Sequence, residues 1–194
     1  MKELKLNVPD DKAQVFAKEM MELMRKYDVT AEDVDSLLPI TERVKTYEDA
    51  CKVLGIQPVD FYALRYSSPI DGSRCFLEKD EVAYIKLKTI ADALNEGWKP
   101  KFTDDEYRYF PWFVFYTQKE LDDMDEEDKA DIRVLGRSGS SASAGAGVAY
   151  SGTGNASLNS GAVSGGRLCF KNRDLAEYAG KQFLDIWADF VFAE

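Results

Sequence analysis

The chain has 194 residues, with 25 basic side chains, 35 acidic side chains and a formal net charge of −10 at pH 7. Binding to phosphate backbones and to anionic membranes depends on clustered Lys and Arg. The sequence shows no such cluster, so neither nucleic acid nor membrane is an expected partner. The chain contains no histidine, which excludes Ser–His and Cys–His nucleophile pairs, imidazole bases and histidine metal ligands.

The N-terminal residues 1–60 are predicted to form a helical region. Residues 10–28 have a helical apolar period, with Phe16, Met20 and Leu23 on one face. Two interpretations of this face remain open, namely binding to a partner and ordinary core packing. A capping pattern at Thr30 predicts a short helix that Pro39 ends.

A second capping pattern at Thr46 predicts a helix over Tyr47–Leu54 that ends at Gly55, a residue suited to the left-handed position after a helix. Residues 61–194 are then predicted to form an α+β domain. Its sheet is expected to be small and mainly antiparallel, with strands near 107–116, 132–135 and 167–170. Two helices, 78–96 and 174–192, are expected to pack against this sheet. Pro111 cannot donate to a strand ladder, so it predicts a bulge, a strand start or an edge.

Residues 120–131 contain eight carboxylates in twelve residues. Such oxygen-rich segments can bind calcium, but the glycine and the distant glutamate of a helix–loop–helix calcium site are missing. A solvated loop between two strands is the favoured interpretation. Three widely spaced cysteines (Cys51, Cys75 and Cys169) predict neither a disulfide framework nor a zinc site, and they favour a reducing compartment.

Residues 138–166 stand out because 22 of these 29 residues are Gly, Ser or Ala and none is charged. A connection of this length inside a compact domain is typically functional or disordered. Val148 and Tyr150 within it indicate short strands or turns. The segment is therefore predicted to be a contact surface ordered by a neighbour, with a floppy surface loop as the alternative.

Four strings, Ala93–Pro100, Tyr109–Phe113, Gly166–Lys171 and Leu175–Phe183, resemble an uncharacterised protein family associated with phages and prophages of gut anaerobes. The resemblance covers roughly residues 45–194. It implies a setting, the cytoplasm of a bacterial host with incorporation into a virion as an option, but no activity, catalytic residue or cofactor.

The sequence and the resemblance together predict a non-enzymatic, phage-type structural or interaction protein that uses the Ser/Gly/Ala-rich segment and an aromatic C-terminal helix as contact surfaces. Its expected partners are copies of itself or other phage particle proteins. The alternative is a module that binds carbohydrate or protein, including a host-surface glycan, through a variable loop at 138–166. No catalytic, cofactor-binding or metal-binding residue is predicted, and the expected contact residues are Arg137, Tyr150, Asn155, Leu158, Asn159, Arg167 and Trp187.

Overall fold

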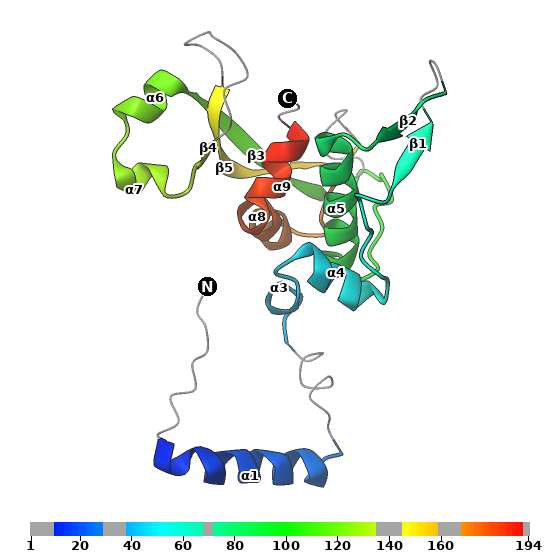
Figure 1. Ribbon diagram of the computed structural model, residues 1–194, viewed down its shortest axis with the longest axis vertical. Helices are drawn as coiled ribbons and strands as arrows, with labels where there is room; N and C mark the ends of the chain where they lie inside the picture. The colour runs from blue at the N-terminus through cyan, green and yellow to red at the C-terminus, as the bar shows by residue number, and fades with distance from the viewer. Residues whose placement is uncertain (1–9, 29–37, 68–71, 135–144, 159–167, 192–194) are drawn as a thin grey trace. The chain divides into compact units, whose positions relative to one another are not determined.

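The computed structural model describes residues 10–28, 38–67, 72–134, 145–158 and 168–191 (Figure 1). The chain divides into two compact units, Met1–Pro39 and Ile40–Glu194. In the first unit, helix α1 (Asp10–Lys26) confirms the helix predicted from the apolar period. The short helix predicted after Thr30 lies outside the described residues.

The second unit is an α+β fold built on a three-stranded antiparallel sheet. Its strands β3 (Arg108–Thr117), β4 (Arg133–Val134) and β5 (Gly145–Ala156) are arranged in the order β3-β5-β4. Pro111 lies on β3, an edge strand of this sheet, and the register shifts between Trp112 and Phe113. Of the three alternatives predicted for this proline, the edge is confirmed, and the irregularity lies between the two residues that follow it.

The centre of the small-residue segment forms β5, the middle strand of the sheet. This confirms the strand indicated by Val148 and Tyr150 and corrects the alternative of a floppy surface loop. Ala146 and Val148 are buried there. Because glycine has no side chain, groups from other segments approach this strand closely. A Cβ at Gly147 would lie 2.8 Å from Ile132 Cγ2, and one at Gly154 would overlap the Trp112 indole. Glycine is needed where backbone and bulky side chains approach this closely.

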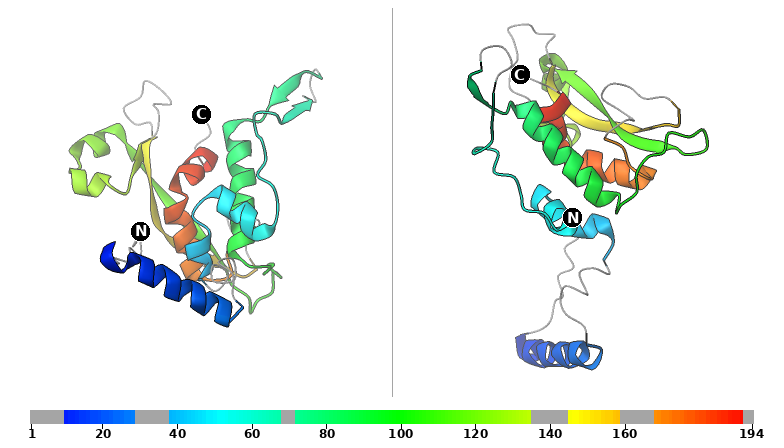
Figure 2. Two further views of the ribbon diagram at one scale, coloured as in Figure 1. Left: turned by 60° about the horizontal axis from the view of Figure 1, so that its bottom comes forward. Right: turned by 90° about the vertical axis from the view of Figure 1, so that its right-hand side faces the viewer.

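Helices α8 (Arg173–Gln182) and α9 (Leu184–Val191) pack against one face of this sheet, and α5 (Lys79–Leu94) packs on α9 (Figure 2). A single helix was predicted over 174–192, but the helix breaks at Phe183, whose φ and ψ are −112° and 29°. The side chain of Asn172 accepts a hydrogen bond from the Leu175 amide and so caps the start of α8.

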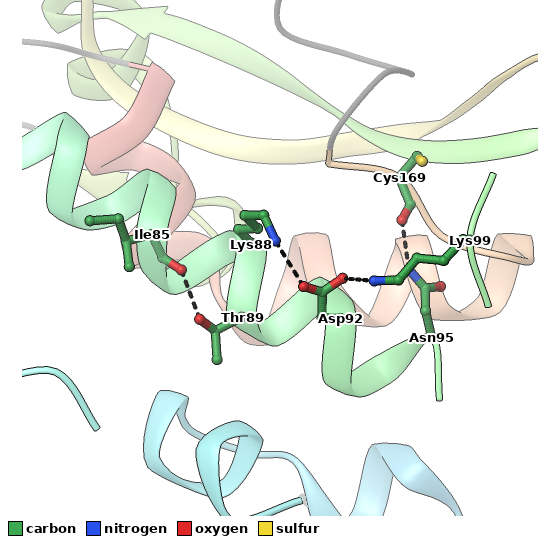
Figure 3. A network of polar contacts seen from close by, with 7 residues as sticks. All are labelled: Ile85, Lys88, Thr89, Asp92, Asn95, Lys99 and Cys169. Carbon is green, nitrogen blue, oxygen red and sulfur yellow. Dashed lines mark hydrogen bonds and ion pairs between the residues drawn. The ribbon is translucent and has the colours of Figure 1, made fainter. Parts of the chain in front are cut away.

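The strand predicted at 167–170 is reduced, among its described residues, to one isolated bridge. Phe170 and Tyr109 exchange backbone hydrogen bonds of 2.8 and 3.0 Å. Just beyond α5, the buried side chain of Asn95 makes two hydrogen bonds with the backbone of this segment (Figure 3). Its Nδ2 donates to the Cys169 carbonyl at 2.8 Å, and its Oδ1 accepts from the Lys171 amide at 2.9 Å.

Helices α3 (Ile40–Arg43) and α4 (Tyr47–Leu54) belong to the second unit. Thr46 makes the predicted capping box, and Gly55 adopts the left-handed conformation with φ 67°. Val44 and Cys51 are completely buried in the main core. The unit boundary therefore falls at Pro39, and not near residue 60 as the sequence suggested.

Two further segments lie outside the main core. A hairpin of β1 (Arg65–Ser67) and β2 (Arg74–Phe76) projects away from α5 (Figures 1 and 2). The acidic run 120–131 contains two short helices, α6 (Gln118–Asp123) and α7 (Glu126–Lys129), in place of the predicted loop. In the described part of the chain, no helix has the length and apolar character needed to cross a membrane.

Candidate functional site

The predicted contact residues that the structure describes differ in burial and do not lie together. Trp187 is only 4% exposed, its indole nitrogen donates to the Ala179 carbonyl at 3.1 Å, and its ring lies 5.4 Å from that of Phe113. It serves the core, so the expectation that it forms a contact surface is wrong. Leu158, by contrast, is 64% exposed, just beyond the end of β5.

Asn155 is also exposed near the end of β5, whereas Tyr150 is half-buried in the middle of the strand. The expected contact residues Arg137, Asn159 and Arg167 lie outside the described residues. The structure therefore does not gather the described members of the predicted set into one site: Tyr150 lines one cleft, and Trp187 lines a smaller pocket elsewhere.

That cleft has a volume of about 520 Å³. It lies between the connection that precedes β4, the middle of β5 and the junction of α8 with α9. Its lining combines an aromatic ring, two cations, two carboxylates, an amide and a few apolar groups: Ala130, Asp131, Ile132, Arg133, Tyr150, Lys181, Gln182, Leu184 and Asp185. These residues come from three distant parts of the sequence, so no local pattern could have predicted the cleft.

Both cations of the cleft are engaged in ion pairs. Arg133 Nε lies 2.6 Å from Asp185 Oδ1, and Lys181 Nζ lies 2.7 Å from Glu177 Oε1. The hydrogen bond with Glu177 raises the pKa of Lys181 above its ordinary value, and the charge of Asp131 adds to this effect. Lys181 therefore stays protonated near neutral pH and cannot act as a base or an amine nucleophile there.

The aromatic ring of Tyr150 is held in place from several sides. A Cβ on Gly180 would lie 2.5 Å from its Cδ2 atom, so the ring packs directly on the backbone of α8. Its hydroxyl is 2.6 Å from Thr153 Oγ1, and the Lys181 ammonium lies 5.4 Å from the ring centroid. The ring is a rigid part of the cleft wall, which suits binding more than movement.

The hairpin β1–β2 and the chain leading into it form a second candidate surface. Tyr62 is 88% exposed and Phe76 is 55% exposed. The guanidinium carbon of Arg65 lies 3.4 Å from the centroid of the Phe76 ring. No strand was predicted here from the sequence, because the apolar residues of 61–64 are consecutive and have no alternating pattern.

Helix α1 provides a third surface. Its apolar stripe has heptad-like spacings of 4, 3 and 4 residues, and the side chains in it are exposed by 36 to 64%: Phe16, Met20, Leu23 and Tyr27. This spacing is that of helices that pair through a narrow apolar seam. Within the described residues, no group of three or more cysteines, aspartates and glutamates is placed to hold a metal ion.

Comparisons with known proteins identify no relative: no family model, no curated protein and no solved structure matches the chain.

Proposed function

We propose that this protein is a non-enzymatic interaction protein that assembles with copies of itself, and that α1 forms the contact between copies. The observation that carries the proposal is the exposed apolar stripe of α1 at heptad spacing, with Met20 44% exposed and Leu23 53% exposed. The proposal keeps the class of function expected from the sequence and moves the contact surface to a different element.

The physical argument starts from the length of α1. A helix of 17 residues is marginally stable by itself in water, because helix nucleation is unfavourable and propensity alone does not offset it. Burial of the apolar stripe supplies the missing stabilisation. Residues spaced by 3 and 4 fit the same spacing on an identical helix, so a second copy of α1 offers a matching surface.

The non-enzymatic part of the proposal is supported by the cleft beside Tyr150. Of the two cations in this cleft, Lys181 is held protonated by Glu177, and Arg133 is paired with Asp185. No histidine is available anywhere in the chain to act as a base. The phage setting rests on the sequence resemblance alone and stays a prediction.

The experiment compares the native chain with a double variant, Met20→Glu with Leu23→Glu, by sedimentation equilibrium over a range of protein concentrations. Lys18→Glu is the matched control, because Lys18 lies on the opposite side of α1. We expect the native chain and the control to exceed the monomer mass of 21.9 kDa as concentration rises. The double variant is expected to stay monomeric.

Both variants change only the first unit, so the fold of Ile40–Glu194 provides an internal reference that circular dichroism can check. A native chain that remains monomeric at all concentrations contradicts the proposal. Equal self-association of the native chain and the double variant contradicts the assignment to α1.

A further inference from the structure

The cleft beside Tyr150 is balanced in charge. Asp131 and Asp185 contribute two carboxylates, and Arg133 and Lys181 contribute two cations. Each cation is already paired, Arg133 with Asp185 at 2.6 Å and Lys181 with a glutamate on its own helix at 2.7 Å. An anionic ligand would have to break one of these pairs, so the cleft disfavours anions.

The cleft contains both hydrogen-bond donors and hydrogen-bond acceptors. The ammonium of Lys181 has three donors, of which Glu177 takes one. The carboxylate of Asp131 is exposed and offers acceptors, and the carbonyl oxygen of Gln182 offers another, since its amide nitrogen donates to Lys45 O at 3.0 Å. Hydroxyl groups both donate and accept, so a ligand with several hydroxyls satisfies such a mixed lining.

The aromatic wall supplies the apolar part of the recognition. Tyr150 is fixed by Gly180 on one side and by Thr153 at its hydroxyl, so its ring needs no ordering when a ligand binds. The C–H face of a sugar ring packs well on an aromatic surface of this kind. The volume of about 520 Å³ lies within the range of about 300–1,000 Å³ that is usual for small-molecule sites.

We propose that the cleft between β5 and the α8–α9 junction binds a neutral carbohydrate, with Tyr150 as the stacking platform and Asp131 as a hydrogen-bond acceptor for its hydroxyls. This site is distinct from the contact on α1 and does not depend on self-association. It also differs from the variable loop expected from the sequence, because its lining combines a fixed strand residue with helical ones.

The test uses the full chain and a panel of neutral disaccharides built from glucose, galactose, mannose and N-acetylglucosamine. Saturation-transfer NMR identifies the members that bind, and an NMR titration then gives their dissociation constants. Inorganic phosphate and an acidic tetrapeptide are titrated in parallel. We expect saturable binding of at least one disaccharide and weaker binding of both charged probes.

Three variants localise the binding. Asp131→Asn replaces an exposed carboxylate with a neutral amide. It should weaken the binding of the disaccharide by about tenfold, the effect of losing a hydrogen bond to a charged group. Tyr150→Ala removes the ring that serves as the stacking platform and should abolish saturable binding of the disaccharide. Asn155→Ala, on the same strand but outside the cleft, is the control and should bind as the native chain does.

Three outcomes overturn the proposal. The first is that no disaccharide in the panel binds saturably, and the second is that phosphate or the peptide binds more tightly than every sugar. The third is that Asp131→Asn binds as strongly as the native chain and the control. This last variant keeps the test decisive if changes at Tyr150 alter the fold.

Discussion

At the scale of single residues, two glycines of the second unit should respond in opposite ways to the same substitution. Alanine is favoured over glycine inside a helix by about 1 kcal/mol, yet a Cβ on Gly180 would lie 2.5 Å from Tyr150 and 2.8 Å from Pro111. Overpacking of this kind costs about 1–3 kcal/mol. We therefore expect Gly180→Ala to lower the free energy of unfolding, measured by urea denaturation.

Gly152→Ala is the matched control, since nothing lies within 4 Å of a Cβ at that position on β5. Its free energy of unfolding should stay within about 0.5 kcal/mol of the native value or rise slightly. Equal destabilisation by the two substitutions would mean that α8 does not pack on the sheet as closely as described.

Asn95 carries the second residue-scale prediction. Replacement by leucine removes the buried hydrogen bond to the Cys169 carbonyl and the partly buried one from the Lys171 amide. Removing one partner of a buried hydrogen bond costs about 1–3 kcal/mol. Asp92 pairs with Lys88 and Lys99 close by (Figure 3), but it is partly exposed. Asp92→Asn should cost less than about 1 kcal/mol, as exposed ion pairs usually do.

Thermal unfolding of the two variants distinguishes these environments. A clearly lower melting temperature for Asn95→Leu than for Asp92→Asn is the expected result. The reverse order would show that the segment around Cys169 is held mainly by other contacts.

The same residues show what could be predicted from sequence at this scale. The caps at Thr46 and Asn172 were predictable because a cap is defined by neighbours within three residues. The role of Asn95 was not predictable, since its partners lie 74 and 76 residues away along the chain. The burial of Trp187 in the core depends equally on distant packing.

At the scale of elements, Tyr178 connects α8 to the α3–α4 connection. Its hydroxyl donates to the Val44 carbonyl at 2.7 Å, and burial, with the charges of Glu42 and Asp49, raises the pKa of Tyr178 to about 12. An unfolded chain releases this proton near pH 10, roughly two units lower. Between these values the unfolded state binds fewer protons, so stability falls as pH rises.

Tyr178→Phe removes this titration along with the hydrogen bond. We expect the variant to be less stable than the native chain at pH 8 and to lose less stability than the native chain between pH 10 and 12. Urea midpoints measured across this range provide the comparison. Parallel curves for the two proteins would contradict the assignment of the raised pKa to Tyr178.

The elements also show where sequence patterns fail. α1, α5 and β3 were predicted close to their observed bounds because each has a long periodic or aromatic pattern. β5 was missed as the central strand because its Gly, Ser and Ala residues have low intrinsic strand preference. Cross-strand packing, and not local propensity, decides its structure: the Trp112 indole lies over Gly154.

At the scale of the whole molecule, the β1–β2 hairpin belongs to the second candidate surface. Two strands of three residues are too short to be stable alone in water. Phe76 on the hairpin and Tyr62 in the chain leading into it are nevertheless exposed. Because both side chains are exposed, Tyr62→Ser with Phe76→Ser should change the melting temperature of the monomeric chain very little.

The same double variant should lower the tendency of the protein to bind to hydrophobic-interaction columns, because it removes exposed aromatic surface. The control is Ser73→Ala, which replaces an exposed serine on the same hairpin with alanine. A strong loss of thermal stability in the double variant would show that the hairpin packs more than its exposed side chains indicate.

The candidate sites illustrate the same limit for the molecule as a whole. The stripe on α1 was visible in the sequence because it lies on one helix. The cleft beside Tyr150 was not, because Asp131, Tyr150 and Lys181 meet only when β5 takes the middle of the sheet and α8 covers it.

Hydrogen–deuterium exchange of the interior amides of α1, followed by mass spectrometry at several protein concentrations, tests self-association through this helix most directly. We predict that these amides exchange quickly in dilute solution and become protected as the concentration rises, while the protection of α5 stays constant. Protection of α1 that is independent of concentration, or absent at every concentration, would contradict the account.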